Sequence, residues 1–127
     1  MKLHAIFLSG LLATPVFADP VEGVWQTQAG DDGAFGHVEI APCGEAICGT
    51  LVRAYQKGGT QIESATVGRQ IVWAMEPAAN GRYKGGKIWA PDRDKTYNSK
   101  MSLSGDMLNV SGCVLGICRT QVWRRVK

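Results

Sequence analysis

The sequence has no apolar run long enough to cross a membrane as a helix, which takes about 20 residues. The mostly apolar stretch from Leu3 to Ala13 is much shorter. The chain also has no Cys-x-x-Cys and no Gly-x-Ser-x-Gly motif, so the usual redox and hydrolase signatures are missing. Repeats and low-complexity segments are absent too. The net charge of +3 is too weak to indicate a nucleic-acid partner.

The N-terminus has the three parts of a secretory signal peptide. Lys2 supplies a positive charge, an apolar stretch follows, and Val16 and Ala18 place small residues at −3 and −1 of a cut after Ala18. A buried N-terminal helix is the alternative, but it does not explain the small residues at the cleavage site. We therefore expect residues 1–18 to be removed, residues 19–127 to form one domain, and the protein to be periplasmic or secreted.

The four cysteines form two pairs of equal spacing, Cys43/Cys48 and Cys113/Cys118. If each pair flanks a hairpin with a two-residue turn, Glu45-Ala46 or Leu115-Gly116, its members lie opposite one another as a close cross-strand pair. We therefore predict local disulfides 43–48 and 113–118. Crossed connectivities and a zinc site of four thiolates are the alternatives, and the oxidising compartment reached by export favours disulfides.

Short segments separated by Gly, Pro, Asp and Asn turns are typical of an antiparallel β meander. Within 96–103, for example, Tyr97 and Met101 share one face and the polar Asn98 and Lys100 the other. We expect an all-β fold, a small eight-stranded antiparallel up-and-down barrel, with a two-sheet sandwich as the alternative. Residues 63–69 are a candidate for a short helical turn. The expected strands are 23–27, 37–41, 47–55, 70–75, 82–89, 96–103, 107–112 and 118–126.

Five blocks of sequence resemble a known family when they are taken in this order. They are Gly23-Val-Trp25, the Cys43-Gly44 and Cys48-Gly49 dipeptides, Gly85–Pro91 followed by Lys95-Thr96-Tyr97, Leu108–Gly112, and Gln121–Arg125. The chain is similar to an exported bacterial family that is catalogued as a domain of unknown function and has a lipocalin-like β-barrel. The family usually has a longer middle segment, which is short here at 58–68. The resemblance implies a fold but no reaction.

The likeness to lipocalins also implies a role for the Gly-x-Trp at the start of the first strand. In lipocalins an Arg from the end of the barrel packs on this Trp, so Trp25 and Arg125 (or Arg124) are expected to stack. A cation over an indole face contributes about 1–2 kcal/mol when it is partly desolvated. We expect Trp25, Trp123 and Arg125 to close one end of the barrel and to be structural.

An eight-stranded barrel is wide enough either to be filled by side chains or to hold one small ligand. We expect a pocket lined by Trp73, Trp89, Tyr97, Met101 and Gln121. The predicted function is a non-catalytic binder of a small hydrophobic or amphipathic ligand. The alternative is a structural or protein-interaction module of the envelope with a filled barrel. An envelope protein is then the expected partner, and neither nucleic acid nor stable membrane insertion is expected.

No catalytic or metal site is predicted. His37 and Glu39 share a strand face, so an acid–base pair for a hydrolase is conceivable, but a solvated strand face explains them better. Asp92 and Asp94 lack the further oxygen ligands and the distal Glu of a calcium loop, so they are read as a turn. We expect no cofactor.

Overall fold

The computed structural model describes residues 18–127, so the predicted signal peptide lies outside the described residues apart from Ala18. Within this part of the chain, strands make up almost all of the regular structure. No helix in it is long and apolar enough to span a membrane. The elements are β1 (Gly23–Gln26), β2 (Phe35–Cys43), β3 (Ala46–Tyr55), β4 (Gln61–Ile62), β5 (Gln70–Pro77), the 3₁₀ turn η1 (Ala79–Gly81), β6 (Arg82–Ala90), β7 (Lys95–Ser104), β8 (Met107–Val114) and β9 (Ile117–Arg125).

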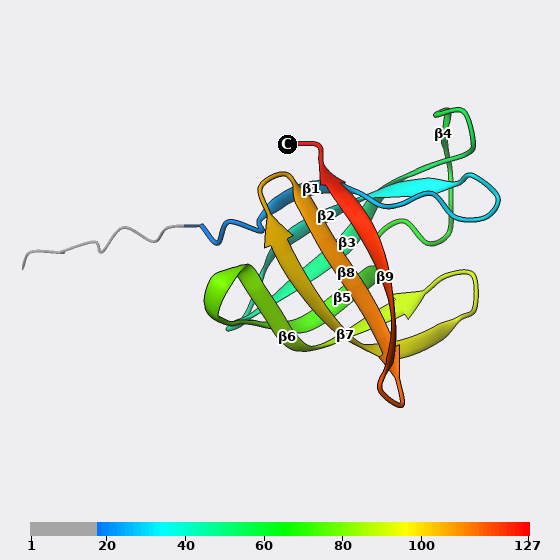
Figure 1. The fold of residues 1–127 in the computed structure, drawn as a ribbon. Helices are drawn as coiled ribbons and strands as arrows, with labels where there is room; N and C mark the ends of the chain where they lie inside the picture. Colours follow the sequence, from blue (N-terminus) through cyan, green and yellow to red (C-terminus); the bar gives the residue numbers. More distant parts are fainter. Residues whose placement is uncertain (1–17) are drawn as a thin grey trace, which may run out of the picture.

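Eight of these strands close into a ring. The hydrogen-bonded order is β2-β1-β9-β8-β7-β6-β5-β3, and β3 pairs with β2 to complete the circle. All pairs are antiparallel, and each strand of the ring lies beside its neighbours along the chain except where β9 returns to β1. The prediction of an eight-stranded up-and-down barrel is therefore confirmed (Figure 1). The two-residue β4 is an addition that pairs only with the end of β3.

Cross-strand partners share a face of the sheet, so the register separates the inside of the barrel from the outside. On β7, Ser99 and Met101 are buried, and their inward-facing partners on β8 are Gly112 and Val110. The core formed in this way is mostly aliphatic and includes three buried tryptophans, Trp25, Trp89 and Trp123. The fully buried side chains are Trp25, Trp123, Ile40, Met75, Leu108, Val21, Val38, Val72 and Val110.

Strands β5 and β6 both bend sharply, and the bend changes which residues face inward. The pairing of β6 with β7 shifts by one residue between Tyr83 and Gly86, and Gly85 there has a φ of 73°. On β5 the non-glycine residue Ala74 has a φ of 58°. A bulge of this kind reverses the alternation of the strand. Tyr83 and Gly86 are therefore both buried, although simple alternation would place them on opposite faces.

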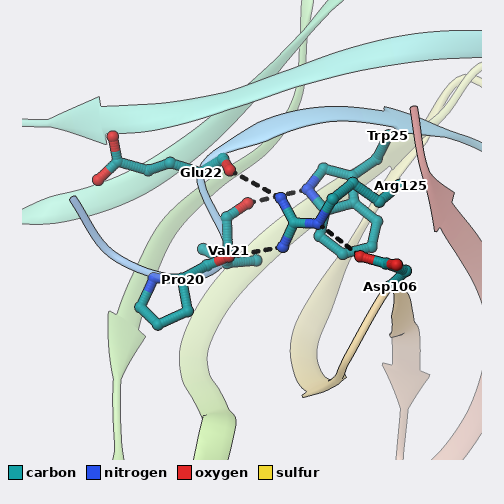
Figure 2. Close-up of polar contacts among 6 residues, drawn as sticks. All are labelled: Pro20, Val21, Glu22, Trp25, Asp106 and Arg125. Atoms are coloured by element: carbon teal, nitrogen blue, oxygen red, sulfur yellow. Dashed lines mark hydrogen bonds and ion pairs between the residues drawn. The ribbon is translucent and has the colours of Figure 1, made fainter. Parts of the chain in front are cut away.

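The end of the barrel where β1 begins and β9 ends is closed by the stacking that the Gly-x-Trp motif implied. The guanidinium carbon of Arg125 lies 4.4 Å from the centroid of the fully buried Trp25 ring. Arg125 donates hydrogen bonds to the backbone oxygens of Pro20 and Glu22 and forms an ion pair with Asp106 at 3.2 Å (Figure 2). The indole nitrogen of Trp25 donates to the backbone oxygen of Val21 at 2.8 Å, so the chain before β1 folds across this end.

Gly23 is required at this closed end for two reasons. Its φ is 138°, a conformation that residues with a side chain rarely adopt. A Cβ atom at this position would also lie 2.6 Å from the backbone oxygen of Lys127. The close approach lets Val24 exchange backbone hydrogen bonds with the C-terminal residues Val126 and Lys127. The glycine of the Gly-x-Trp motif therefore allows β1 to pair with the C-terminal residues.

Both predicted disulfides, Cys43–Cys48 and Cys113–Cys118, are present. In the second hairpin, Cys113 and Cys118 are direct cross-strand partners around a Leu115-Gly116 turn, as predicted. In the first hairpin the predicted turn is wrong by one residue. Cys43 pairs with Ala46, and Cys48 lies two residues further along β3, opposite Ala41.

The turn of this first hairpin is Gly44-Glu45, because a two-residue hairpin favours a residue with positive φ at its first position. Gly44 meets this requirement with a φ of 66°. The disulfide therefore joins diagonal neighbours whose Cα atoms are 5.8 Å apart, within the usual range.

The segment between β3 and β5 also differs from expectation. Residues 63–69, a candidate for a helical turn, form hydrogen-bonded turns with no helix. The hydroxyl of Ser64 accepts a hydrogen bond from the backbone N–H of Thr66, and this local bond competes with helix formation. Together with β4, the segment forms an extension that stands away from the barrel wall (Figure 1).

Candidate functional site

Three of the five residues predicted to line a pocket face the inside of the barrel. Met101 is buried in the core, with 3% of its surface exposed. Tyr97 pairs with Ile88 and is half-buried, and Gln121 pairs with Val110 and is exposed. The interior is therefore filled around Met101 and meets solvent around Gln121, toward the end opposite Arg125.

The other two predicted residues, Trp73 and Trp89, also contact the hydrophobic core, but the strand register places them on the other face of the sheet. Trp73 pairs with Lys87, and Trp89 lies two residues from Lys87 on the same strand, so all three share the outer face. Lys87 is exposed and its ammonium donates a hydrogen bond to Asn98. Trp73 and Trp89 share a face with Lys87 because the bend in β5 and β6 reverses the alternation that would place both indoles inside the barrel.

Trp89 is buried as part of the core cluster, and two polar side chains also contact its ring. The guanidinium carbon of Arg69 lies 3.3 Å from the centroid of its ring. The indole nitrogen donates to the carboxylate of Asp94 at 2.9 Å. Asp94 therefore anchors the turn between β6 and β7. Among residues 18–127, no three His, Cys, Asp or Glu side chains gather in a way that would hold a metal ion.

His37 is half-buried on the outer face and is held by three side chains. Its Nε2 lies 3.2 Å from the amide oxygen of Gln26. Its Nδ1 lies 3.4 Å from both the Nε of Arg53 and the hydroxyl of Tyr55. The carboxylate of Glu39, two residues along the strand, is exposed and is not among these partners.

These contacts fix the proton on the His37 ring. The Arg53 Nε–H can only donate, so Nδ1 is the acceptor and the ring proton resides on Nε2, facing Gln26. Burial, and after it the charge of Arg53, lower the pKa of His37 below its usual 6.5. At neutral pH the ring is a hydrogen-bond acceptor for Arg53.

A hollow of about 620 Å³ lies beside this cluster, between the end of β3, the strand β4 and the turns that lead to β5. Ile62 and Val67, which line it, are 39% and 41% exposed, so apolar surface is open to solvent there. Arg53 lines the same hollow while it donates to His37. The apolar lining is Val52, Ala54, Ile62, Ala65 and Val67, and the polar lining is Arg53, Gln61, Glu63 and Ser64.

Sequence reasoning did not find this hollow. The two residues of β4 are too few to show a strand pattern, and the position of the segment depends on its pairing with Ala54 and Tyr55. One signal was present. Arg53 and Tyr55 are two residues apart on a strand, so their side chains share a face. Their cross-strand partners on β2, His37 and Phe35, are also two residues apart.

Comparison with known proteins places the fold and the family. No curated protein matches the chain. Among solved structures, the chain is similar to "Protein HP1028 from the human pathogen Helicobacter pylori belongs to the lipocalin family". The TM-score is 0.68 and the identity is 16%, over 87% of this chain and 85% of that one. At this identity the likeness concerns the fold, a lipocalin-like barrel. A family model described as "Uncharacterized protein conserved in bacteria (DUF2147)" matches residues 23–125. The chain therefore belongs to this bacterial family, DUF2147.

Proposed function

We propose that the protein is an exported, non-catalytic binder of a small amphipathic ligand and that the ligand occupies the hollow beside β4. The observation that carries this proposal is the hollow itself. Its volume of about 620 Å³ lies within the range of small-molecule sites. It combines exposed aliphatic side chains with a cation, as an amphipathic ligand requires. The lipocalin-like fold supports a binding role as an analogy only.

The binding role is preferred over catalysis because of what His37 contacts. An acid–base catalyst needs a partner that orients it and a substrate proton within reach. The ring of His37 instead has both nitrogens occupied by Gln26 and by Arg53 with Tyr55. In this arrangement His37 positions Arg53.

The two disulfides indicate an oxidising compartment outside the cytoplasm. We propose that the chain reaches the periplasm or the exterior by cleavage after Ala18. The contacts of Asp19 make it part of the folded domain, as a mature chain that begins at this residue requires. Its carboxylate accepts hydrogen bonds from the hydroxyl of the buried Tyr83 and from the backbone of Val21. N-terminal sequencing of the exported protein should begin at Asp19.

Native mass spectrometry tests the binding role. We expect the protein purified gently from its exported compartment to carry an extra mass that is released on denaturation. The denatured protein should weigh four hydrogens less than the reduced chain because of its two disulfides. Ala65→Trp should fill the hollow and remove the extra mass, and Ala29→Trp, in an exposed loop, should not. A bare wild-type protein would contradict the proposal.

A second candidate function rests on the hairpin between β8 and β9. Leu115 is 97% exposed and Ile117 is 73% exposed at its tip, which projects from the barrel and is closed by Cys113–Cys118 (Figure 1). Exposed aliphatic side chains on a rigid hairpin suit insertion into an apolar pocket of an envelope protein.

A photo-crosslinker at position 115 tests this second function, with one at Glu45 on the other disulfide hairpin as the control. Crosslinking to one defined envelope protein from position 115 alone, lost in Ile117→Ser, would support it. Equal or absent crosslinking from both positions would contradict it.

A further inference from the structure

The guanidinium of Arg53 is only partly used by the protein. Its Nε donates to His37. Within residues 18–127, no hydrogen bond or ion pair extends from its two terminal nitrogens. By contrast, Arg125 at the closed end uses all three nitrogens on protein acceptors. Arg53 therefore has donors to offer to a group in the hollow that it lines.

The surroundings of Arg53 hold it in a defined orientation. The acceptor Nδ1 of His37 fixes Nε, and the opposite side of the His37 ring is tied to Gln26. Tyr55, which also reaches Nδ1, is stacked on Phe35 with the ring centroids 5.0 Å apart. A guanidinium held through Nε presents its two terminal nitrogens as a planar fork, which matches the geometry of a carboxylate.

We propose that Arg53 binds the carboxylate of a singly charged amphipathic ligand in this hollow and that His37 is a positioning residue for it. This inference rests on the proposed binding function. The aliphatic lining, which includes Val52, Ile62 and Val67, takes the apolar part of the ligand.

The acidic Glu63 in the same lining sets a limit on ligand charge. A second negative charge on the ligand would be repelled by this carboxylate and would gain little more from a single cation. A monocarboxylate should therefore be preferred to a phosphate monoester with the same chain. The polar groups of Gln61 and Ser64 remain for hydroxyl or amide groups on the ligand.

The experiment compares four probes of equal chain length: octanoate, octanol, octyl phosphate and octylamine. Binding to the exported protein is measured by calorimetry and, independently, by the ¹⁵N–¹H signal of the Arg53 Nε group. Octanoate should bind most tightly and shift that signal. Arg53→Met keeps the apolar stem and should weaken octanoate binding about tenfold or more. Arg124→Met, at an exposed arginine on β9, is the matched control and should change nothing.

Two further variants separate positioning from folding. Arg53→Lys keeps the charge but loses the fork, so it should bind octanoate more weakly than wild type and better than Arg53→Met. His37→Gln should weaken octanoate binding several-fold and leave octanol binding unchanged, which a general loss of stability would not do. Urea midpoints confirm that each variant is folded.

The outcomes distinguish binding in the hollow from recognition of a carboxylate. If octanol and octanoate bind equally and Arg53→Met affects neither, the hollow is a binding site and the carboxylate inference is wrong. If octyl phosphate binds more tightly than octanoate, the limit set by Glu63 is wrong. If none of the four probes binds, the proposed function fails for this class of ligand, and the inference fails with it.

Discussion

Arg125 lies over Trp25 with 4.4 Å between its guanidinium carbon and the ring centroid, and the two residues come from opposite ends of the described chain. They are also direct cross-strand partners, because β9 pairs with β1 at this position. The same guanidinium holds the backbone of Pro20 and Glu22, so one side chain connects β9, β1 and the segment before β1. The end of the barrel is thus closed by a single cation with several partners.

The first prediction concerns this closed end. Trp25→Ala should lower the free energy of unfolding by about 3–5 kcal/mol, because it leaves a large cavity in the core. Arg125→Met keeps the aliphatic stem and should cost about 1–2 kcal/mol through loss of the cation–π contact and hydrogen bonds. Urea denaturation measures both, with Arg124→Met as the control. An unchanged urea midpoint for Trp25→Ala would show that this end does not depend on the tryptophan.

The second prediction concerns the start of the mature chain. The backbone nitrogen of Asp19 donates to the carboxylate of Glu22 at 2.7 Å. Cleavage after Ala18 would turn this nitrogen into an ammonium group and the hydrogen bond into an ion pair. A chain that starts at Asp19 should therefore be more stable than one with an additional N-terminal Gly-Ser, by about 0.5–1 kcal/mol.

A double-mutant cycle isolates this contribution. Glu22→Gln should abolish the difference between the two N-termini, because it removes the charge that the ammonium group faces. High salt should reduce the difference as well. If the difference persists in Glu22→Gln, the ion pair is not its source.

The third prediction concerns the tip of the β8–β9 hairpin. Leu115 has a φ of 51°, a left-handed conformation that costs most residues about 1–2 kcal/mol and that Asn tolerates better. Leu115→Asn should therefore stabilise the protein by up to about 1 kcal/mol in chemical denaturation. Ile117→Asn is the control, since Ile117 is exposed and has no positive φ, and it should give no gain. Equal effects of the two changes would mean that the turn is not strained.

The fourth prediction concerns pH. The pKa of His37 is below its usual 6.5 because of burial and the nearby charge of Arg53. Just below pH 6.5 the unfolded chain therefore binds more protons at this residue than the folded protein, and stability falls as the pH drops through this window. Urea midpoints should fall less steeply in His37→Gln than in wild type between pH 7 and pH 5, and this difference should vanish at pH 8.

An NMR titration checks the cause directly, because His37 is the only histidine after residue 18. Arg53→Met should raise the pKa of the ring toward 6.5, since it removes the positive charge. A wild-type ring that titrates at or above 6.5 would contradict the assignment of Nδ1 as the acceptor for Arg53.

Most of the fold follows from short-range patterns. Alternation and turn residues place all eight strands of the ring within a few residues of their observed bounds. The Gly-x-Trp motif and the arginine near the C-terminus point to the meeting of β1 and β9, and cysteine spacing predicts both disulfides. These features are predictable because each depends on neighbours in sequence or on a motif with one dominant geometry.

The candidate site was less predictable because it depends on departures from those patterns. The bend near Ala74 and Gly85 reverses the alternation of β5 and β6, so Trp73 and Trp89 share a face with Lys87 although both still contact the core. Alternation alone carries no sign of a bulge. The hollow, in turn, depends on how the extension at β4 packs beside Arg53, a long-range contact without a local signal.

The pairing of β1 with β9 has a consequence for when the protein can fold. The sheet cannot close into a ring until its last strand, β9, is available. Arg125 on that strand also binds the backbone of residues next to the proposed cleavage site. A chain that is still being synthesised lacks this strand and exposes an open sheet edge. Completion of the barrel must therefore follow delivery of β9, and until then β1 and β8 keep edges that lack a partner strand.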